Sequence, residues 1–212
     1  MEFLHPLALA YAERFTSAEE LLLQEVATET ITSHEQAHML SGPVQGKFLE
    51  LISYIMQPKR ILEIGTFTGY SALCLAKGLL KDGKLHTIEL READAAAAKA
   101  NFNRSNEAGK IILHTGNALE IIPALEETWD IVYIDADKVS YTEYYKMVLP
   151  KVRQGGLIIA DNVLFHGEVL AETIKGKNAK GIQAFNEYVQ KDQSVEKVLL
   201  TVRDGLFLIR KK

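Results

Sequence analysis

Short apolar runs alternate with amphipathic segments along most of this 212-residue chain. The runs have the length of buried strands and are bounded by polar or glycine-containing turns. They lie at residues 60–64, 84–90, 110–115, 129–135 and 156–160. Helical spacing follows them from residue 71, at 91–106, at 117–125, at 141–148 and at 182–189. Repeated alternation of this kind predicts a largely parallel sheet with helices on both faces.

The C-terminal part of the chain departs from that alternation. Two further strands, at 195–202 and 206–210, flank Asp204-Gly205, a dipeptide typical of a two-residue hairpin turn. Such a turn joins only antiparallel strands. The predicted fold is therefore α/β, with a doubly wound, Rossmann-like sheet of seven strands that ends in an antiparallel hairpin.

The first sixty residues contain no convincing strand pattern. Ser17-Ala18-Glu19-Glu20 predicts a capping box that opens a helix. Gly42-Pro43 predicts a loop at 39–43. A second helix is expected at 44–56, with an apolar stripe formed by Phe48, Leu51, Ile52 and Ile55. We expect one domain over residues 1–212, divided into an N-terminal helical segment (1–57) and a Rossmann-like core (58–212).

Composition excludes several classes of protein. The net charge of −4 provides no basic face for nucleic acid. No apolar run approaches the length of a membrane span, so we expect no membrane partner. The single cysteine, Cys74, excludes an internal disulfide and is typical of a reducing compartment. We expect a cytoplasmic protein in which Cys74 is a small buried hydrophobe.

A glycine turn follows the first strand, where the crevice of an open α/β sheet binds nucleotide-like ligands. Gly65 and Gly69 allow the backbone to approach such a ligand closely. Their Gly-x-x-x-Gly spacing lacks the middle glycine of dinucleotide-binding loops, and Glu63 would repel a phosphate. The loop therefore favours S-adenosylmethionine (SAM) over a nicotinamide dinucleotide. Glu89 follows at about the distance where a carboxylate commonly binds ribose hydroxyls.

A second group of polar residues ends two other strands. Asp135, Asp161 and Asn162 would form an all-oxygen site suited to Mg²⁺, or to Ca²⁺ or Mn²⁺. Lys138 follows Asp135 by three residues. A neighbouring dication would disfavour its charged form, which makes it a candidate general base. A solvated surface lysine is the alternative for an isolated Asp-x-x-Lys.

Three segments resemble the metal-dependent O-methyltransferases, a family that includes caffeoyl-CoA and catechol O-methyltransferases and small bacterial homologues. They are Glu-Ile-Gly-Thr-Phe-Thr-Gly-Tyr-Ser, Ile-Asp-Ala-Asp-Lys and Gly-Gly-Leu-Ile-Ile-Ala-Asp-Asn-Val-Leu, and the resemblance extends from about residue 39 to the C-terminus. It implies SAM and a divalent cation as cofactors, a small phenolic acceptor and a homodimer to which the N-terminal helices contribute.

The resemblance also implies a role for each matching residue. Residues that contact SAM would be Glu63, Gly65, Thr66 and Ser71 at the methionine end, Glu89 at the ribose, Ala118 beside the adenine, Ser41 in the loop that closes over the methionine, and also Asp135. The metal ligands would be Asp135, Asp161 and Asn162, and the catalytic residues Lys138 and Asp135. Phe207 stands where the catechol enzymes carry an acid that contacts the acceptor, so catechol itself is a doubtful substrate. Residues 167–180, which shape the acceptor pocket in relatives, show no sequence pattern that indicates a particular acceptor.

Other functions remain alternatives. His34-Glu35-Gln36-Ala37-His38 matches the His-Glu-x-x-His motif of zinc metallopeptidases, which requires both histidines on one helical face and a third ligand. An NAD-dependent oxidoreductase is a second alternative, disfavoured by the missing middle glycine. A non-catalytic protein that kept the fold is a third, and the complete set of Asp135, Lys138, Asp161 and Asn162 argues against it.

Overall fold

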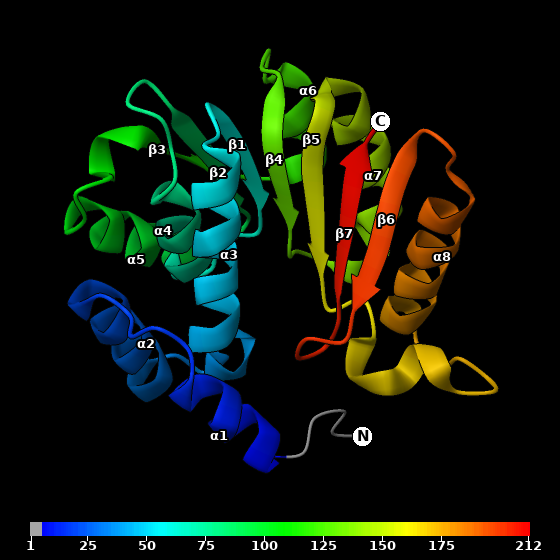
Figure 1. The fold of residues 1–212 in the computed structure, drawn as a ribbon, viewed down its shortest axis with the longest axis horizontal. Coiled ribbons are helices and arrows are strands. Elements are labelled where there is room, and N and C mark those ends of the chain that lie inside the picture. Colours follow the sequence, from blue (N-terminus) through cyan, green and yellow to red (C-terminus); the bar gives the residue numbers. More distant parts are fainter. Residues whose placement is uncertain (1–5) are drawn as a thin grey trace.

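A seven-stranded sheet forms the centre of the molecule, in the order β3-β2-β1-β4-β5-β7-β6 (Figure 1). The computed structural model describes residues 6–212, so the first five residues of the predicted N-terminal segment lie outside the described part. The strands are β1 Arg60–Ile64, β2 Lys84–Glu89, β3 Ile111–Thr115, β4 Trp129–Ile134, β5 Val152–Asp161, β6 Val195–Leu200 and β7 Leu206–Lys211. β7 is antiparallel to both β5 and β6, and the other pairs are parallel. The predicted fold class is confirmed.

Helices cover both faces of the sheet. They are α1 Pro6–Arg14, α2 Leu21–Ser33, α3 Pro43–Met56, α4 Tyr70–Ala76, α5 Glu92–Asn103, α6 Ala118–Ala124, α7 Tyr141–Val148 and α8 Lys177–Lys191. Short 3₁₀ turns are η1 Ala37–Met39, η2 Ala108–Lys110, η3 Lys138–Ser140, η4 Leu149–Lys151 and η5 Phe165–Leu170. One core cluster joins α7 and α8 to the sheet through Tyr145, Ile182 and Phe185. The other joins α2, α3 and α4 to its opposite face through Val26, Leu49 and Leu73.

The start of α2 differs from the prediction. A capping box would begin the helix at Ser17, but the helix begins at Leu21 and its N-cap residue is Glu20. The acidic side chains of the predicted box are engaged elsewhere. Glu19 accepts a hydrogen bond from the Tyr70 hydroxyl, and Glu20 pairs with the ammonium of Lys77. Contacts with α4 thus replace the local cap.

The apolar stripe predicted on α3 is only partly buried: Phe48 and Ile52 pack against the core, whereas Leu51 and Ile55 do not. The buried residues of this helix are Gln45, Gly46, Leu49 and Ser53. Leu51 and Ile55, which belong to the predicted stripe, are 53% and 76% exposed. Leu49 is therefore joined on the buried face by small or polar residues. Gly46 is one of them because α3 packs closely on α4: a Cβ at Gly46 would lie 2.7 Å from the Tyr70 hydroxyl oxygen.

The antiparallel ending is confirmed, but its turn is longer than two residues. β6 ends at Leu200 and β7 begins at Leu206, which pair with each other. The intervening residues contact the segment that follows β5, where the N–H groups of Val163 and Leu164 donate to the carbonyls of Gly205 and Asp204. This wider loop brings Arg203 to the carboxyl end of the sheet.

Candidate active site

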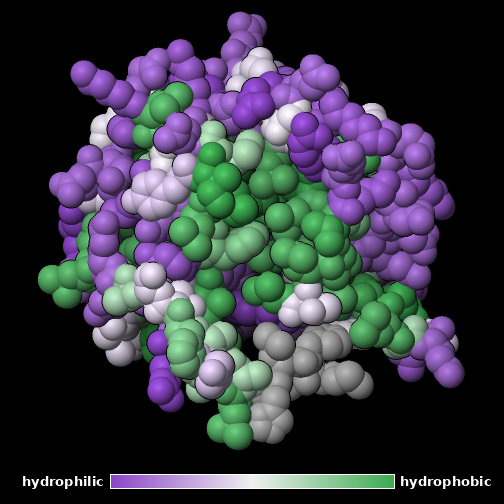
Figure 2. All heavy atoms as spheres, in the orientation of Figure 1, coloured by the Kyte–Doolittle hydropathy of each residue, from purple (hydrophilic) through white to green (hydrophobic). Residues whose placement is uncertain are grey.

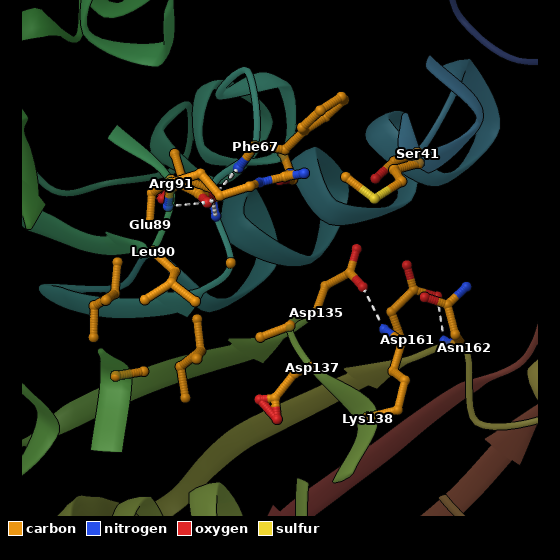
Figure 3. A pocket seen from close by; sticks show the side chains of 18 of the residues that line it. Ser41, Phe67, Glu89, Leu90, Arg91, Asp135, Asp137, Lys138, Asp161 and Asn162 are labelled. Carbon is orange, nitrogen blue, oxygen red and sulfur yellow. Dashed lines mark hydrogen bonds and ion pairs between the residues drawn. The ribbon is translucent and has the colours of Figure 1, made fainter. Parts of the chain in front are cut away.

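A cavity of about 460 Å³ lies at the carboxyl ends of the central strands. Its volume is within the range of small-molecule sites, roughly 300–1,000 Å³. It is lined by all the predicted site residues except Glu63, namely Ser41, Gly65, Thr66, Ser71, Glu89, Ala118, Asp135, Lys138, Asp161 and Asn162. Figure 3 shows two groups of polar side chains on opposite sides of it, one around Glu89 and one around Asp161.

The loop after β1 is built on the carboxylate of Glu89. Its Oε2 accepts hydrogen bonds from the backbone N–H groups of Thr66 (3.1 Å) and Phe67 (2.7 Å), and its Oε1 accepts from that of Arg91 (3.0 Å). A carboxylate has about four acceptor positions, so Oε1 retains one for a ligand. Gly65 has a φ of 94°, and a Cβ there would lie 2.0 Å from the carbonyl oxygen of Asp135. Only glycine lets the two strand ends approach so closely.

Glu63 lies beneath this loop rather than in the cavity. It is fully buried, and its Oε2 accepts a hydrogen bond from the Thr87 hydroxyl at 2.5 Å. Burial raises the pKa of Glu63 to about 8, against the effect of hydrogen bonds from Ser71 and Thr87. Among the described residues its Oε1 has no hydrogen-bond partner. The surroundings of Glu63 therefore favour the neutral carboxylic acid over the carboxylate.

Asp135, Asp161 and Asn162 converge on the other side of the cavity, as predicted. Asp135 follows β4, and Asp161 is the last residue of the neighbouring β5. Asn162 has a φ of 55°, which turns the chain at this point. Burial and the charge of Asp135 raise the pKa of Asp161 to about 6. Two carboxylates that oppose each other's ionisation are stabilised by a cation placed between them.

Lys138 extends into the same group from η3. Its Nζ donates to Oδ1 of Asp135 at 2.8 Å and to the hydroxyl oxygen of Tyr141 at 2.7 Å (Figure 3 shows the first contact). Burial alone would lower the pKa of Lys138, but the charge of Asp135 outweighs it and raises that pKa above the ordinary value. Lys138 is therefore held as an ammonium ion in this state and is not the solvated surface lysine of the alternative interpretation.

Several residues of this network were not identified from the sequence. Tyr141 opens the segment 141–148, whose helical spacing is typical of core packing, and its ring does lie edge-to-face on Phe185, with the centroids 5.4 Å apart. Its hydroxyl also reaches the carbonyl oxygen of Asp161, at 3.0 Å. Gln45 and Arg203 carried no signal at all, because their contacts join segments that are far apart in the sequence.

The His34–His38 motif does not form a zinc site. α2 ends at Ser33, and His34 has an extended backbone with φ −100° and ψ 128°. The His34 ring is hydrogen-bonded to Asp94 at 2.9 Å and packs against Phe67. Within residues 6–212 no group of three His, Cys, Asp or Glu side chains is arranged to hold a metal ion. The helix required for the peptidase motif is therefore absent from this segment.

Comparison with known proteins decides between the remaining interpretations. The family model described as O-methyltransferase matches residues 13–212. The chain belongs to the O-methyltransferase family. Because the match includes both groups of cavity residues, it assigns the whole described core to this family and not to the oxidoreductases.

Individual members of the family resemble the chain over most of its length. A catechol O-methyltransferase of Niastella koreensis is 37% identical, over 82% of this chain and 80% of that protein. A probable caffeoyl-CoA O-methyltransferase of Dictyostelium discoideum is 31% identical, over 96% of this chain and 89% of that protein. The crystal structure of an O-methyltransferase from Bacillus cereus in complex with SAH matches with a TM-score of 0.89 and 33% identity, covering 96% of each chain.

Proposed function

We propose that this O-methyltransferase transfers the methyl group of SAM to a hydroxyl of a small polyhydroxylated aromatic acceptor, and that the reaction depends on a divalent cation. The observation that carries the proposal is the shared cavity: the loop held by Glu89 and the carboxylates Asp135 and Asp161 face one space. Both proposed ligands can therefore approach one acceptor oxygen.

The residues on the Glu89 side fit SAM. Glu89 keeps an acceptor position for a ribose hydroxyl, and Gly65, which lines the cavity, lets the backbone at Asp135 lie directly against this loop. Ser41, Thr66, Ser71 and Asp135 would bind the methionine end, and Ala118 would border the adenine. Glu63, which lies beneath the loop, would attract the positively charged amino group of the methionine moiety. When bound, SAM supplies an electrophilic methyl group. The Bacillus cereus relative was crystallised with SAH, the demethylated form of this cofactor.

The residues on the Asp161 side fit a hard divalent cation. Asp135, Asp161 and Asn162 offer two carboxylates and one amide, all oxygen donors of the kind that Mg²⁺ prefers, and Ca²⁺ and Mn²⁺ accept the same set. Burial and the charge of Asp135 raise the pKa of Asp161 to about 6 against the opposing charge of Lys138, and a bound dication would favour the ionised carboxylate. When bound, the cation lowers the pKa of an acceptor hydroxyl and fixes its direction.

Lys138 is the proposed general base. Its Nζ lies in the group of polar side chains around Asp161, held by Asp135 and Tyr141. A cation bound to Asp135 would weaken the charge that raises the pKa of Lys138, and the amine could then accept the proton of the acceptor hydroxyl. The cavity walls align the acceptor with the methyl donor, an effect worth up to roughly 7–11 kcal/mol in favourable intramolecular models.

The acceptor class rests on the family, and catechol itself stays a doubtful substrate. Two curated relatives are named for catechol and caffeoyl-CoA. Phe207 is buried against Phe185, with ring centroids 6.2 Å apart, so this position supplies no carboxylate to an acceptor. Phe165 and His166 of η5 line the cavity and are candidates for acceptor contacts.

The proposal includes a cytoplasmic homodimer in which residues 1–57 and 58–212 act as one unit. Cys74 is buried, as expected of a structural thiol in a reducing compartment. Within the described residues no helix is long and apolar enough to cross a membrane. Figure 2 shows a broad hydrophobic area on the face where α3 and the strands β5, β7 and β6 lie toward the viewer in Figure 1. Leu51 and Ile55 of α3 and Val198 of β6 are exposed, which supports contact with a second copy through this face.

Methyl transfer from labelled SAM tests the proposed function. Vicinal-diol phenolics are screened as acceptors with Mg²⁺, and again after treatment with EDTA. We expect transfer to at least one acceptor, loss of transfer with EDTA and recovery when Mg²⁺ is restored. Transfer that is equal with and without EDTA would remove the cation from the mechanism.

A further inference from the structure

Asp161 is almost saturated with hydrogen bonds from the protein itself. Its Oδ2 accepts from the side-chain amide of Gln45 at 2.5 Å and from the hydroxyl of Tyr133 at 2.9 Å. Its Oδ1 accepts from the backbone N–H of Asn162 at 2.7 Å. Of the four acceptor positions of a carboxylate, three are therefore used, and the remaining one is on Oδ1.

Gln45 is the unexpected member of this arrangement. It lies on α3, is fully buried, and is separated from Asp161 by 116 residues in the sequence. Its amide nitrogen has two hydrogens, which are directed to the Tyr133 hydroxyl oxygen and to Asp161 Oδ2. A flipped amide would place oxygen against the carboxylate, so the contacts fix its orientation.

Arg203 completes the network from the β6–β7 connection. One guanidinium nitrogen donates to Oε1 of Gln45 at 3.2 Å, and the other donates to the carbonyl oxygen of Leu40 at 3.0 Å. Leu40 immediately precedes Ser41, which lines the SAM side of the cavity. The same guanidinium thus contacts the Ser41 loop and the amide that holds Asp161.

We propose that Gln45 is a positioning residue for Asp161, which it restricts to binding a cation through the single oxygen Oδ1, and that Arg203 couples this arrangement to the Ser41 loop. This inference rests on the proposed metal-dependent function. Without Gln45, Oδ2 has a free acceptor position and the carboxylate can rotate. Groups that orient a metal ligand typically contribute roughly 10–100-fold to metal affinity.

Direct binding of Mn²⁺ tests the role of Gln45 independently of activity. The dissociation constant is measured by electron paramagnetic resonance of free Mn²⁺, and SAH affinity by calorimetry. Gln45→Met keeps the side chain's length and removes the donor. Tyr133→Phe removes the other donor to the same oxygen with little risk to folding. Ser53→Ala is the matched control, because Ser53 is also buried on α3 but donates to Leu75 in α4.

We expect Gln45→Met and Tyr133→Phe each to weaken Mn²⁺ binding by about tenfold or more. SAH affinity should be unchanged, and Ser53→Ala should bind Mn²⁺ like the wild type. Unlike these variants, Arg203→Met should weaken the binding of both Mn²⁺ and SAH, because Arg203 also donates a hydrogen bond to the Ser41 loop.

Two results would contradict the inference, and they can be told apart. If the wild type binds Mn²⁺ and both donor variants bind it equally well, Gln45 has only a structural role and the proposed function stands. If the wild type itself binds no Mn²⁺ in the presence of SAH, the metal-dependent function fails and the inference fails with it.

Discussion

The Nζ of Lys138 lies 2.8 Å from Oδ1 of Asp135, so the proposed base and a proposed metal ligand form one ion pair. This pair raises the pKa of Lys138, mainly through the charge of Asp135. Lys138 is therefore protonated in this state. Under the proposed function, it would accept a proton only when a cation shares Asp135.

Lys138→Arg distinguishes a base from a structural cation. Arginine retains a charge that can pair with Asp135 but is not deprotonated in proteins. We expect Lys138→Arg and Lys138→Met both to lower the methyl-transfer rate by about 10²–10⁴-fold while SAH affinity is retained. Rates from labelled SAM, with SAH calorimetry as the folding control, check this. Full activity of Lys138→Arg would mean that only the positive charge is needed.

Asp161→Ala should abolish the stimulation of methyl transfer by Mg²⁺ while leaving SAH binding largely intact. SAH binding should be retained because Asp161 lies at the end of β5, whereas the loop held by Glu89, which is proposed to bind SAH, follows β1. The rate is measured over a Mg²⁺ titration for the wild type and the variant. An Mg²⁺ response like that of the wild type would show that this carboxylate is not a ligand.

Gly181→Ala should slow methyl transfer even though alanine ordinarily stabilises a helix by about 1 kcal/mol over glycine. Gly181 lies on α8, where a Cβ would be 2.7 Å from the carbonyl oxygen of Lys138 and 2.9 Å from the Cα of Val139. The added methyl must displace the turn that carries the base. Gly109→Ala is the matched control, since a Cβ there meets nothing within 4 Å. Equal turnover of the two variants would refute this packing argument.

Glu63 should make the ligand-free protein less stable as pH rises. Its pKa is raised from 4.5 to about 8 by burial, so the folded state binds a proton that the unfolded state releases. This contribution is fully present below pH 4.5 and is lost as pH rises to about 8. Glu63→Gln should remove a loss on the order of a few kcal/mol across that interval.

Urea unfolding at a series of pH values measures the effect of Glu63. The exposed Glu187 of α8 provides the control substitution, Glu187→Gln, which should keep the pH dependence of the wild type. If the Glu63→Gln protein loses stability with pH as steeply as the wild type, another group is responsible.

The sequence predicts the strands well because short apolar runs between turns admit few other structures. The sequence also predicts that Asp135 and Asp161 meet, because they lie at the carboxyl ends of two parallel strands. These strands are neighbours, so their ends lie at one edge of the sheet. Local patterns were misleading where tertiary contacts decided the outcome. Glu20 pairs with Lys77 instead of closing a capping box.

What the sequence could not provide is the network between distant segments. Gln45 is one polar position in the helix predicted at 44–56, and Arg203 precedes the predicted turn at Asp204-Gly205, so neither residue carries a local signal of its contacts. Their contact spans 158 residues and depends on the longer β6–β7 loop that the turn prediction missed. Leu51 and Ile55 face outward, whereas the buried positions of α3 hold Gln45, Gly46, Leu49 and Ser53, and at Gly46 the close approach of Tyr70 leaves no space for a side chain.

A crystal structure of the protein with SAH and Mn²⁺ tests the central claim most directly, because anomalous scattering locates Mn²⁺ without reference to activity. The account predicts one Mn²⁺ peak within coordination distance of Asp135, Asp161 and Asn162, with Asp161 bound through Oδ1 alone. It also predicts SAH along the loop held by Glu89, with its sulfur directed toward the metal. A peak away from these three residues, or SAH bound outside this cavity, would contradict the account.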